Sequence, residues 1–294
     1  MALFGLAAAC VVALVVLYVL AVHTSFGQHL DNDALLGRSQ NPRVQQATNR
    51  LLHSIDVFSL ELIGGAIVLA AVARARVRLA LGAGTLIVGA LATTEAIKHS
   101  LTRPEFLHPD PLPVPSFPSG HTTVAFSLAL ALLLVVPGRW RGPTAVVGAL
   151  YAAAVGAATV TAGWHRPSDV IGAFLVTVGW AAVVSAVLVA EWGPGSVAGR
   201  QHVLRSDRLV VPLLAVGAVL LAVVGFAVAS AVAALRDPHF AAVNFGAAYA
   251  GSVAAIFATG PALVAVLLAC VRDVSLDDPR QRTPAGRRRP LSQP

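Results

Sequence analysis

Residues 169–190 read DVIGAFLVTVGWAAVVSAVLVA, and no charged side chain follows Asp169 before this stretch ends. An α-helix needs about 20 mostly apolar residues to cross a bilayer, so the stretch predicts a membrane-spanning helix. Its apolar residues are continuous and do not alternate with polar ones, which excludes a β-barrel strand. Helices that cross lipid therefore decide the fold.

The same character extends over the whole chain of 294 residues. Hydrophobic residues make up 56% and charged residues 12%, and the mean hydropathy is +0.75. A soluble domain usually carries about a quarter charged residues. The composition excludes a single soluble domain, a disordered chain and a disulfide-rich secreted scaffold. We expect an all-α, polytopic membrane helix bundle, because lipid admits only helices and closed barrels.

Apolar runs of this kind predict about eight transmembrane helices. They lie near residues 3–22, 57–73, 79–99, 121–137, 143–164, 169–190, 209–235 and 246–271. The first helix and an outer loop occupy residues 1–56, and the helical core occupies residues 57–190. Two extra helices follow in residues 191–271, and residues 272–294 are expected to form a disordered basic tail on the cytoplasmic side.

The basic residues indicate how the chain is oriented. The net charge is +7, and the 21 basic residues are 20 arginines and one lysine. Fourteen of them fall in the loops after the second, fourth and sixth spans and in the tail. Positive residues gather on the cytoplasmic side, so both termini are expected to be cytoplasmic. No nucleic-acid partner is expected, because the chain has no basic, aromatic-bearing soluble domain.

The long first outer loop carries apolar residues at helical spacing from Val44 to Ile55. This pattern predicts an amphipathic helix. Two placements stay open from the sequence: the helix lies on the outer membrane surface, or it packs against the bundle.

Three outer segments concentrate ionisable and turn-forming residues. The first reads KHSLTRP at residues 98–104 and brings two cations, Lys98 and Arg103, close to the membrane surface. An arginine offers a bidentate fork and a lysine a point charge, so the pair suits a phosphate group.

The second segment reads PSGH at residues 118–121 and opens the fourth span. Free backbone N–H groups and the helix dipole make such a terminus an anion site, and Gly120 lets a ligand approach the backbone closely. Ser119 is either part of that site or only a helix cap. His121 is placed to give or take a proton.

The third segment, residues 163–169, reads GWHRPSD and separates His165 from Asp169 by four positions. A carboxylate beside an imidazole fixes its tautomer and raises its basicity. Two histidines, a carboxylate and two cations fit phosphoryl transfer through a phosphohistidine. A metal site on these histidines is disfavoured, because the neighbouring cations would repel a metal ion.

These segments resemble, in chain order, the three motifs of the type-2 phosphatidic acid phosphatase superfamily, which includes membrane lipid phosphate phosphatases. The second motif, Pro-Ser-Gly-His, is matched without change, and the His–Asp spacing of the third is matched by His165 and Asp169. The resemblance extends over about residues 57–190. It implies a six-helix phosphatase core, with the last two helices as additions.

The resemblance also implies a role for each matched residue. His165 would attack phosphorus, Asp169 would orient it, and His121 would protonate the leaving alkoxide. The groups that would hold the phosphate oxygens are Lys98, Arg103, Ser119 and Gly120. No metal and no other cofactor would be needed.

The chain departs from the family pattern at two positions. The first motif is two residues short, so Glu105 stands where the family has its arginine, and Thr159 replaces an arginine six residues before the histidine of the third motif. Losing one charge-assisted contact to a transition state costs about 2–4 kcal/mol. We hypothesise that Arg166 supplies the lost charge. Glu95, inside the third span, is expected to pair with Lys98.

The sequence therefore predicts a membrane phosphatase that hydrolyses a lipid phosphate or pyrophosphate on the outer face of the cell membrane. Polyprenyl and phosphatidic-acid substrates are both compatible, and a composition typical of GC-rich bacterial genomes favours the polyprenyl carrier. One alternative is a degenerate family member that binds or moves lipid phosphates, motivated by Thr159. A small-solute transporter is a weaker alternative, because the ionisable residues lie at one membrane face. The sequence predicts no oligomeric state.

Overall fold

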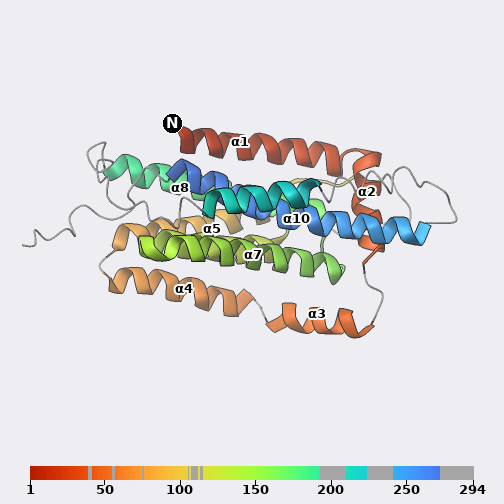
Figure 1. The fold of residues 1–294 in the computed structure, drawn as a ribbon, viewed down its shortest axis with the longest axis horizontal. Helices are drawn as coiled ribbons and strands as arrows, with labels where there is room; N and C mark the ends of the chain where they lie inside the picture. The colour runs from red at the N-terminus through yellow and green to blue at the C-terminus, as the bar shows by residue number, and fades with distance from the viewer. Residues whose placement is uncertain are drawn as a thin grey trace, which may run out of the picture.

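A computed structural model describes residues 1–38, 42–54, 57–74, 76–104, 106, 112, 115–192, 210–223 and 241–271. Every regular element within these residues is a helix (Figure 1). The chain is an all-α polytopic membrane bundle, as the sequence predicted. The predicted tail and the second half of the predicted seventh span lie outside the described residues.

Each of the eight predicted spans coincides with a helix in the part of the chain that the structure describes. Five of these helices are long and apolar enough to cross a membrane: Ala2–Val22, Val77–Ser100, Gly138–Thr161, Pro167–Glu191 and Phe245–Val271. Shorter apolar helices cover Leu62–Ala73, Gly120–Val135 and Val210–Val223. The predicted architecture of long apolar helices is thereby confirmed.

The labelled elements follow the chain in this order. They are α1 (Ala2–Leu17), the π-helix η1 (Tyr18–Val22), α2 (Ser25–Leu36), α3 (Pro42–Ser54), α4 (Val57–Ala73), α5 (Val77–Ser100), α6 (Gly120–Val135), α7 (Gly138–Thr161), α8 (Pro167–Trp192) and α10 (Ala241–Val271). Most of them run along the long axis of the bundle, whereas α2 crosses one end of it (Figure 1).

The helix α6 lies at the centre of the bundle. It packs against α4, α5, α7 and α8, and nearly all of its residues are buried. The rings of Phe126 on α6 and Phe174 on α8 meet edge to face with their centroids 5.0 Å apart. Surrounding helices on every side explain why α6 is apolar around its whole circumference.

The amphipathic helix expected in the first outer loop is α3. Leu52 near its end is buried and clusters with Ala125 on α6 and Val155 on α7. Of the two placements left open by the sequence, the structure therefore shows packing against the bundle. The helix α2 was not predicted, because its residues are largely polar.

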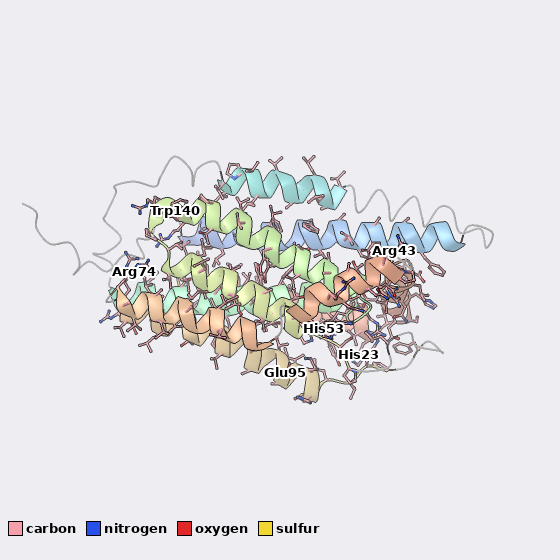
Figure 2. The ribbon with its side chains drawn as sticks, turned by 90° about the horizontal axis from the view of Figure 1, so that it is seen from below. His23, Arg43, His53, Arg74, Glu95 and Trp140 are labelled. Carbon is pink, nitrogen blue, oxygen red and sulfur yellow. The ribbon has the colours of Figure 1, made fainter. Side chains whose placement is uncertain are left out.

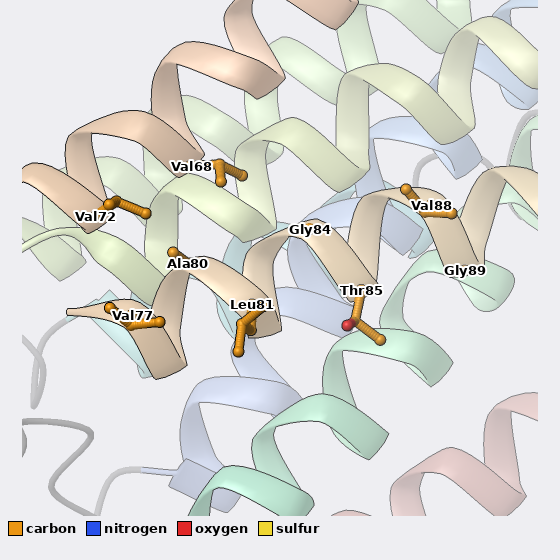
Figure 3. A pocket seen from close by; sticks show the side chains of 9 residues that line it. All are labelled: Val68, Val72, Val77, Ala80, Leu81, Gly84, Thr85, Val88 and Gly89. Atoms are coloured by element: carbon orange, nitrogen blue, oxygen red, sulfur yellow. The ribbon is translucent and has the colours of Figure 1, made fainter.

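The two ends of the bundle differ in chemistry. Arg74 and Trp140 lie toward one end, and His23 and His53 lie toward the other (Figure 2). A groove of about 540 Å³ opens between α4 and α5 near the Arg74 end, and only apolar residues, glycines and Thr85 line it (Figure 3). No lining residue of this groove can titrate, so the candidate chemistry lies elsewhere, at the histidine end.

Candidate active site

The three motif-bearing segments, residues 98–104, 118–121 and 163–169, come together in the structure. The Ser119 backbone N–H donates to the Asp169 carbonyl at 2.9 Å, which joins the second segment to the third. A Cβ added at Gly120 would lie 3.5 Å from Lys98 Nζ, so the first segment also reaches the start of α6. Segments far apart in the chain thus form one site at the end of α5, α6 and α8.

The third segment turns sharply between α7 and α8. Gly163 has a φ of +78°, a left-handed conformation that favours glycine. After this turn the Trp164 and His165 N–H groups donate to the Thr159 carbonyl at 3.0 and 3.4 Å. Pro167 then begins α8 at a position where its missing N–H costs nothing. The turn places His165 just ahead of the helix that carries Asp169.

His165 and Asp169 form the pair that the sequence predicted. His165 Nδ1 lies 3.4 Å from Asp169 Oδ2, and the Arg166 backbone N–H donates to the same oxygen at 2.8 Å. Asp169 is fully buried and His165 is nearly so. A carboxylate at Nδ1 leaves Nε2 as the reactive nitrogen of the ring. The geometry is that of a histidine nucleophile or base with an orienting acid.

His121 is the second histidine of the site. Its ring centroid lies 6.4 Å from that of His165 and 5.2 Å from the Trp164 ring. Lys98 and His53 act on it electrostatically, together with His165. His53 comes from α3 and packs edge-on against Trp164 with centroids 5.2 Å apart. The structure therefore surrounds His121 with groups from α3, α5 and the turn between α7 and α8.

The cation Lys98 already has an acidic partner. Its Nζ donates to Glu95 Oε1 at 2.7 Å, which is the pairing expected from the sequence. Glu95 Oε2 also lies 3.8 Å from His99 Nε2. The free space at Gly120 faces this Lys98–Glu95 pair. An anion at the start of α6 would meet the ammonium group there.

The backbone on both sides of Arg103 is fixed by the N-terminal part of the chain. The Tyr18 hydroxyl donates to the Thr102 carbonyl at 2.7 Å, and Gln28 Nε2 donates to the Pro104 carbonyl at 2.7 Å. The charge of Arg103 acts on Asp31. Glu105 lies outside the described residues.

Ser119 acts as the cap of α6. Its Oγ accepts from the Thr122 N–H at 3.3 Å and donates to Thr122 Oγ1 at 3.0 Å. The hydroxyl is completely buried. The capping alternative is thus what the structure shows for this side chain, and its contact with phosphate stays a prediction.

Arg166 is buried among acceptors of the protein itself. Its guanidinium donates from Nε to Asn32 Oδ1 at 2.9 Å, from Nη1 to Ser116 Oγ at 3.2 Å and from Nη2 to the Leu112 carbonyl at 3.0 Å. Its exposed fraction is 0%. These contacts describe an arginine that joins three segments. That Arg166 binds phosphate in place of the missing family arginine stays a prediction.

The sequence analysis missed the contribution of α2. Gln28, Asp31 and Asn32 are buried and point toward the site segments. Their signal was present in the sequence: they are polar residues spaced three and four apart, which puts them on one helix face. In a chain so poor in polar residues, such a face indicates a buried hydrogen-bonding role.

Asp31 is the titratable member of this group, and Ser168 is its hydrogen-bond partner. It accepts hydrogen bonds from the Ser168 N–H at 3.2 Å and from Ser168 Oγ at 2.5 Å. Burial, and after it the charge of Asp169, raises the pKa of Asp31 to about 6, against the opposing effects of Ser168 and Arg103. Among the described residues, no group of three or more His, Cys, Asp and Glu side chains is placed to hold a metal ion. The metal-independent reaction stays a prediction.

The bundle of apolar helices thus brings a histidine–aspartate pair, a second histidine and a lysine together at one helix N-terminus. Residues 78–193 match the family model of the PAP2 superfamily. This segment is similar to the type-2 phosphatidic acid phosphatase superfamily, whose motifs the sequence resembles. The match begins at α5, so α1 to α4 lie outside it. Comparison with curated proteins and with solved structures gives no match.

Proposed function

We propose that this protein hydrolyses a lipid phosphate or pyrophosphate through a phosphohistidine on His165. The observation that carries the proposal is the separation of His165 and His121, whose ring centroids lie 6.4 Å apart. At this separation one phosphate group can lie beside both rings, with its phosphorus toward His165 and its leaving oxygen toward His121.

The proposed reaction has two steps. His165 Nε2 attacks phosphorus, the bond to the leaving oxygen breaks, and His121 gives that oxygen a proton. Water then attacks the phosphorus while His121 takes a proton from that water; the bond between phosphorus and His165 Nε2 breaks, and inorganic phosphate leaves. Asp169 stabilises the imidazolium form of His165 during the first step.

Charge at the phosphate would come from the first segment and the start of α6. Lys98 and Arg103 are the cations of the first segment, and the N-terminus of α6 adds its free N–H groups. These groups would stabilise the negative charge of the transferring phosphoryl group in the transition state, which lowers the activation barrier.

The proposed orientation places the site on the outer face of the cell membrane. The arginine-bearing turns after α4 and α6 lie at the Arg74 and Trp140 end, opposite His23 and His53 (Figure 2). The positive-inside rule makes the Arg74 end cytoplasmic, with both termini on that side. A lipid substrate could then keep its tail in the bilayer and present its phosphate at the histidine end. Polyprenyl and phosphatidic-acid tails are both compatible.

A second candidate is a member that binds or moves lipid phosphates without hydrolysis. It is favoured by Thr159, which is buried, donates to the Gly156 carbonyl at 2.7 Å and brings no charge to the site. Without that cation the transition state would be less stabilised than in the family pattern.

The test is phosphate release by the full-length protein, purified in detergent with a chelator present. Polyprenyl pyrophosphate, polyprenyl phosphate and phosphatidic acid would be offered in parallel. We expect His165→Ala to abolish release and His29→Ala, a change at an exposed histidine of α2, to preserve it. Release that survives in His165→Ala would refute the phosphohistidine mechanism. Lipid phosphate binding without release in the native protein would favour the non-hydrolytic candidate.

A further inference from the structure

The helix α2 lies across the histidine end of the bundle and outside the segment that matches the family (Figure 1). It buries three polar side chains, Gln28, Asp31 and Asn32, whose exposed fractions are 1%, 6% and 4%. Buried polar groups cost free energy unless they are hydrogen-bonded. Each of the three has its partner on a segment that carries site residues.

Gln28 reaches the first site segment. Its Nε2 donates to the Val22 carbonyl at 2.8 Å and to the Pro104 carbonyl at 2.7 Å. With the Tyr18 hydroxyl on the Thr102 carbonyl, these contacts hold the peptide units on both sides of Arg103. The position of Arg103 is therefore set by the N-terminal part of the chain.

Asp31 reaches the third site segment. Its two carboxylate oxygens accept from the N–H and the hydroxyl of Ser168, in the first turn of α8. An acidic group at a helix N-terminus satisfies an unpaired N–H and complements the helix dipole. Asp31 thus caps α8 from another helix, one residue before Asp169.

Asn32 reaches the residue that follows His165. Its Oδ1 accepts from Arg166 Nε at 2.9 Å, while Ser116 Oγ accepts from Nη1 of the same guanidinium. Arg166 and Ser168 lie on either side of Pro167. Neighbouring residues of α2 therefore hold the His165–Asp169 turn at two points.

We propose that α2 belongs to the phosphate site and that Asp31 and Asn32 are positioning residues. They would fix the position of the His165–Asp169 turn relative to Arg103. The proposal rests on the proposed function, because the register matters for phosphoryl transfer at His165. The first motif is two residues short in this chain, and its Arg103 lies between two backbone carbonyls that the N-terminal part of the chain binds.

The charged groups around Asp31 come from two other segments. Arg103 faces it from the segment after α5, and Asp169 from α8. Ionised Asp31 attracts Arg103 and keeps it beside the turn. Asparagine has nearly the same shape but no charge, so Asp31→Asn separates the electrostatic role from packing.

The experiment compares α2 variants of the full-length protein in detergent. The test variants are Asp31→Asn and Asn32→Ala, and Asn32→Asp restores an acceptor for Arg166. Asp33→Asn is the matched control, because it makes the same chemical change at a half-buried position of α2 that faces His29 and, among the described residues, no residue of the site. Readouts are kcat and KM for the cleaved lipid, the melting temperature and the affinity for inorganic phosphate.

We expect Asp31→Asn and Asn32→Ala to lower kcat/KM about ten- to a hundredfold, the range set by small misplacements of reacting groups. Phosphate affinity should fall with it in Asp31→Asn, while the melting temperature does not fall. Asn32→Asp should recover activity, and Asp33→Asn should behave as the native protein. If α2 were only structural, the variants would lose activity only in proportion to the loss of folded protein.

The proposal is overturned if Asp31→Asn and Asn32→Ala match Asp33→Asn in kcat, KM and phosphate affinity. Should both variants fail to fold, Ser168→Ala removes the hydroxyl contact from the α8 side, and native kinetics in that variant would overturn the proposal equally. If the native protein binds phosphate but releases none from any lipid, the proposed hydrolysis is wrong, and the role of α2 is then tested by phosphate binding alone. Weaker phosphate binding by Asp31→Asn would then still support the role of α2.

Discussion

The Lys98 ammonium group donates to the Glu95 carboxylate at 2.7 Å, one helical turn earlier on α5. The same nitrogen lies 3.5 Å from the Cβ position of Gly120, where α6 begins. Lys98 therefore faces the expected phosphate position while it is paired with an internal carboxylate. A phosphate group must compete with Glu95 for this cation.

Glu95→Gln should strengthen substrate binding. Removing the carboxylate frees the Lys98 charge for the phosphate, and we expect KM to fall about two- to fivefold, the size of an exposed ion pair. Steady-state kinetics on the cleaved lipid measures this change. Glu191→Gln, which loses an exposed pair with Arg78 at the other end of the bundle, is the control. A higher KM in Glu95→Gln would mean that Glu95 positions Lys98.

Asp169→Asn should disable the reaction while leaving the fold intact. The Arg166 N–H would still find an acceptor, but the carboxylate that stabilises the His165 imidazolium would be lost. We expect kcat to fall about a thousandfold or more. Rapid-quench trapping of phosphohistidine checks the step, and a normal yield of that intermediate in Asp169→Asn would contradict the assigned role.

Asp31 should make stability depend on pH. Its pKa is raised by burial from 3.8 to about 6, so the folded state binds more protons than the unfolded state between these values. The contribution of Asp31 to the free energy of unfolding therefore falls as pH rises through this window and is constant above it. Melting temperatures from pH 4 to 7 would be compared for the native protein and Asp31→Asn. The difference should grow in favour of the variant as pH rises, and a constant difference would contradict the raised pKa.

Gly172→Ala should disturb the loop that leads into Ser119. A Cβ at Gly172 would lie 2.8 Å from two atoms of the Phe117 ring, whereas a Cβ at Gly179 would meet Cys10 at an ordinary 3.5 Å. We expect Gly172→Ala to cost about 1–3 kcal/mol of stability and to lower activity, because Phe117 must shift. Thermal unfolding and phosphate release, with Gly179→Ala as the control, test this. Equal behaviour of the two variants would show that the loop adapts freely.

The proposed orientation predicts which cysteines a membrane-impermeant thiol reagent labels in intact cells. His29→Cys should be labelled directly, and Arg74→Cys only after lysis, because the two positions lie at opposite ends of the bundle. Both side chains are exposed. The background for both variants replaces Cys10 and Cys270 by alanine. Labelling of Arg74→Cys in intact cells would reverse the orientation.

The sequence by itself determined the helices and the members of the His165–Asp169 pair. Span length and continuous apolar composition are local properties, so each predicted span coincides with a helix. His165 and Asp169 are four apart, and Glu95 and Lys98 are three apart, so one turn or one helical face brings each pair together. The amphipathic pattern of α3 was equally local.

The tertiary structure alone decided which residues of α2 contact the segment that carries this pair. Asp31 and Ser168 are 137 positions apart, and Asn32 and Arg166 are 134 apart. These contacts depend on how α2 packs across the end of the bundle. Apolar helices of similar composition give no sequence pattern that would predict this packing. The same holds for the Ser119 backbone N–H, which donates to the Asp169 carbonyl of another segment. Periodicity and spacing reveal groups that share one helix, whereas contacts between helices follow from packing of the whole chain.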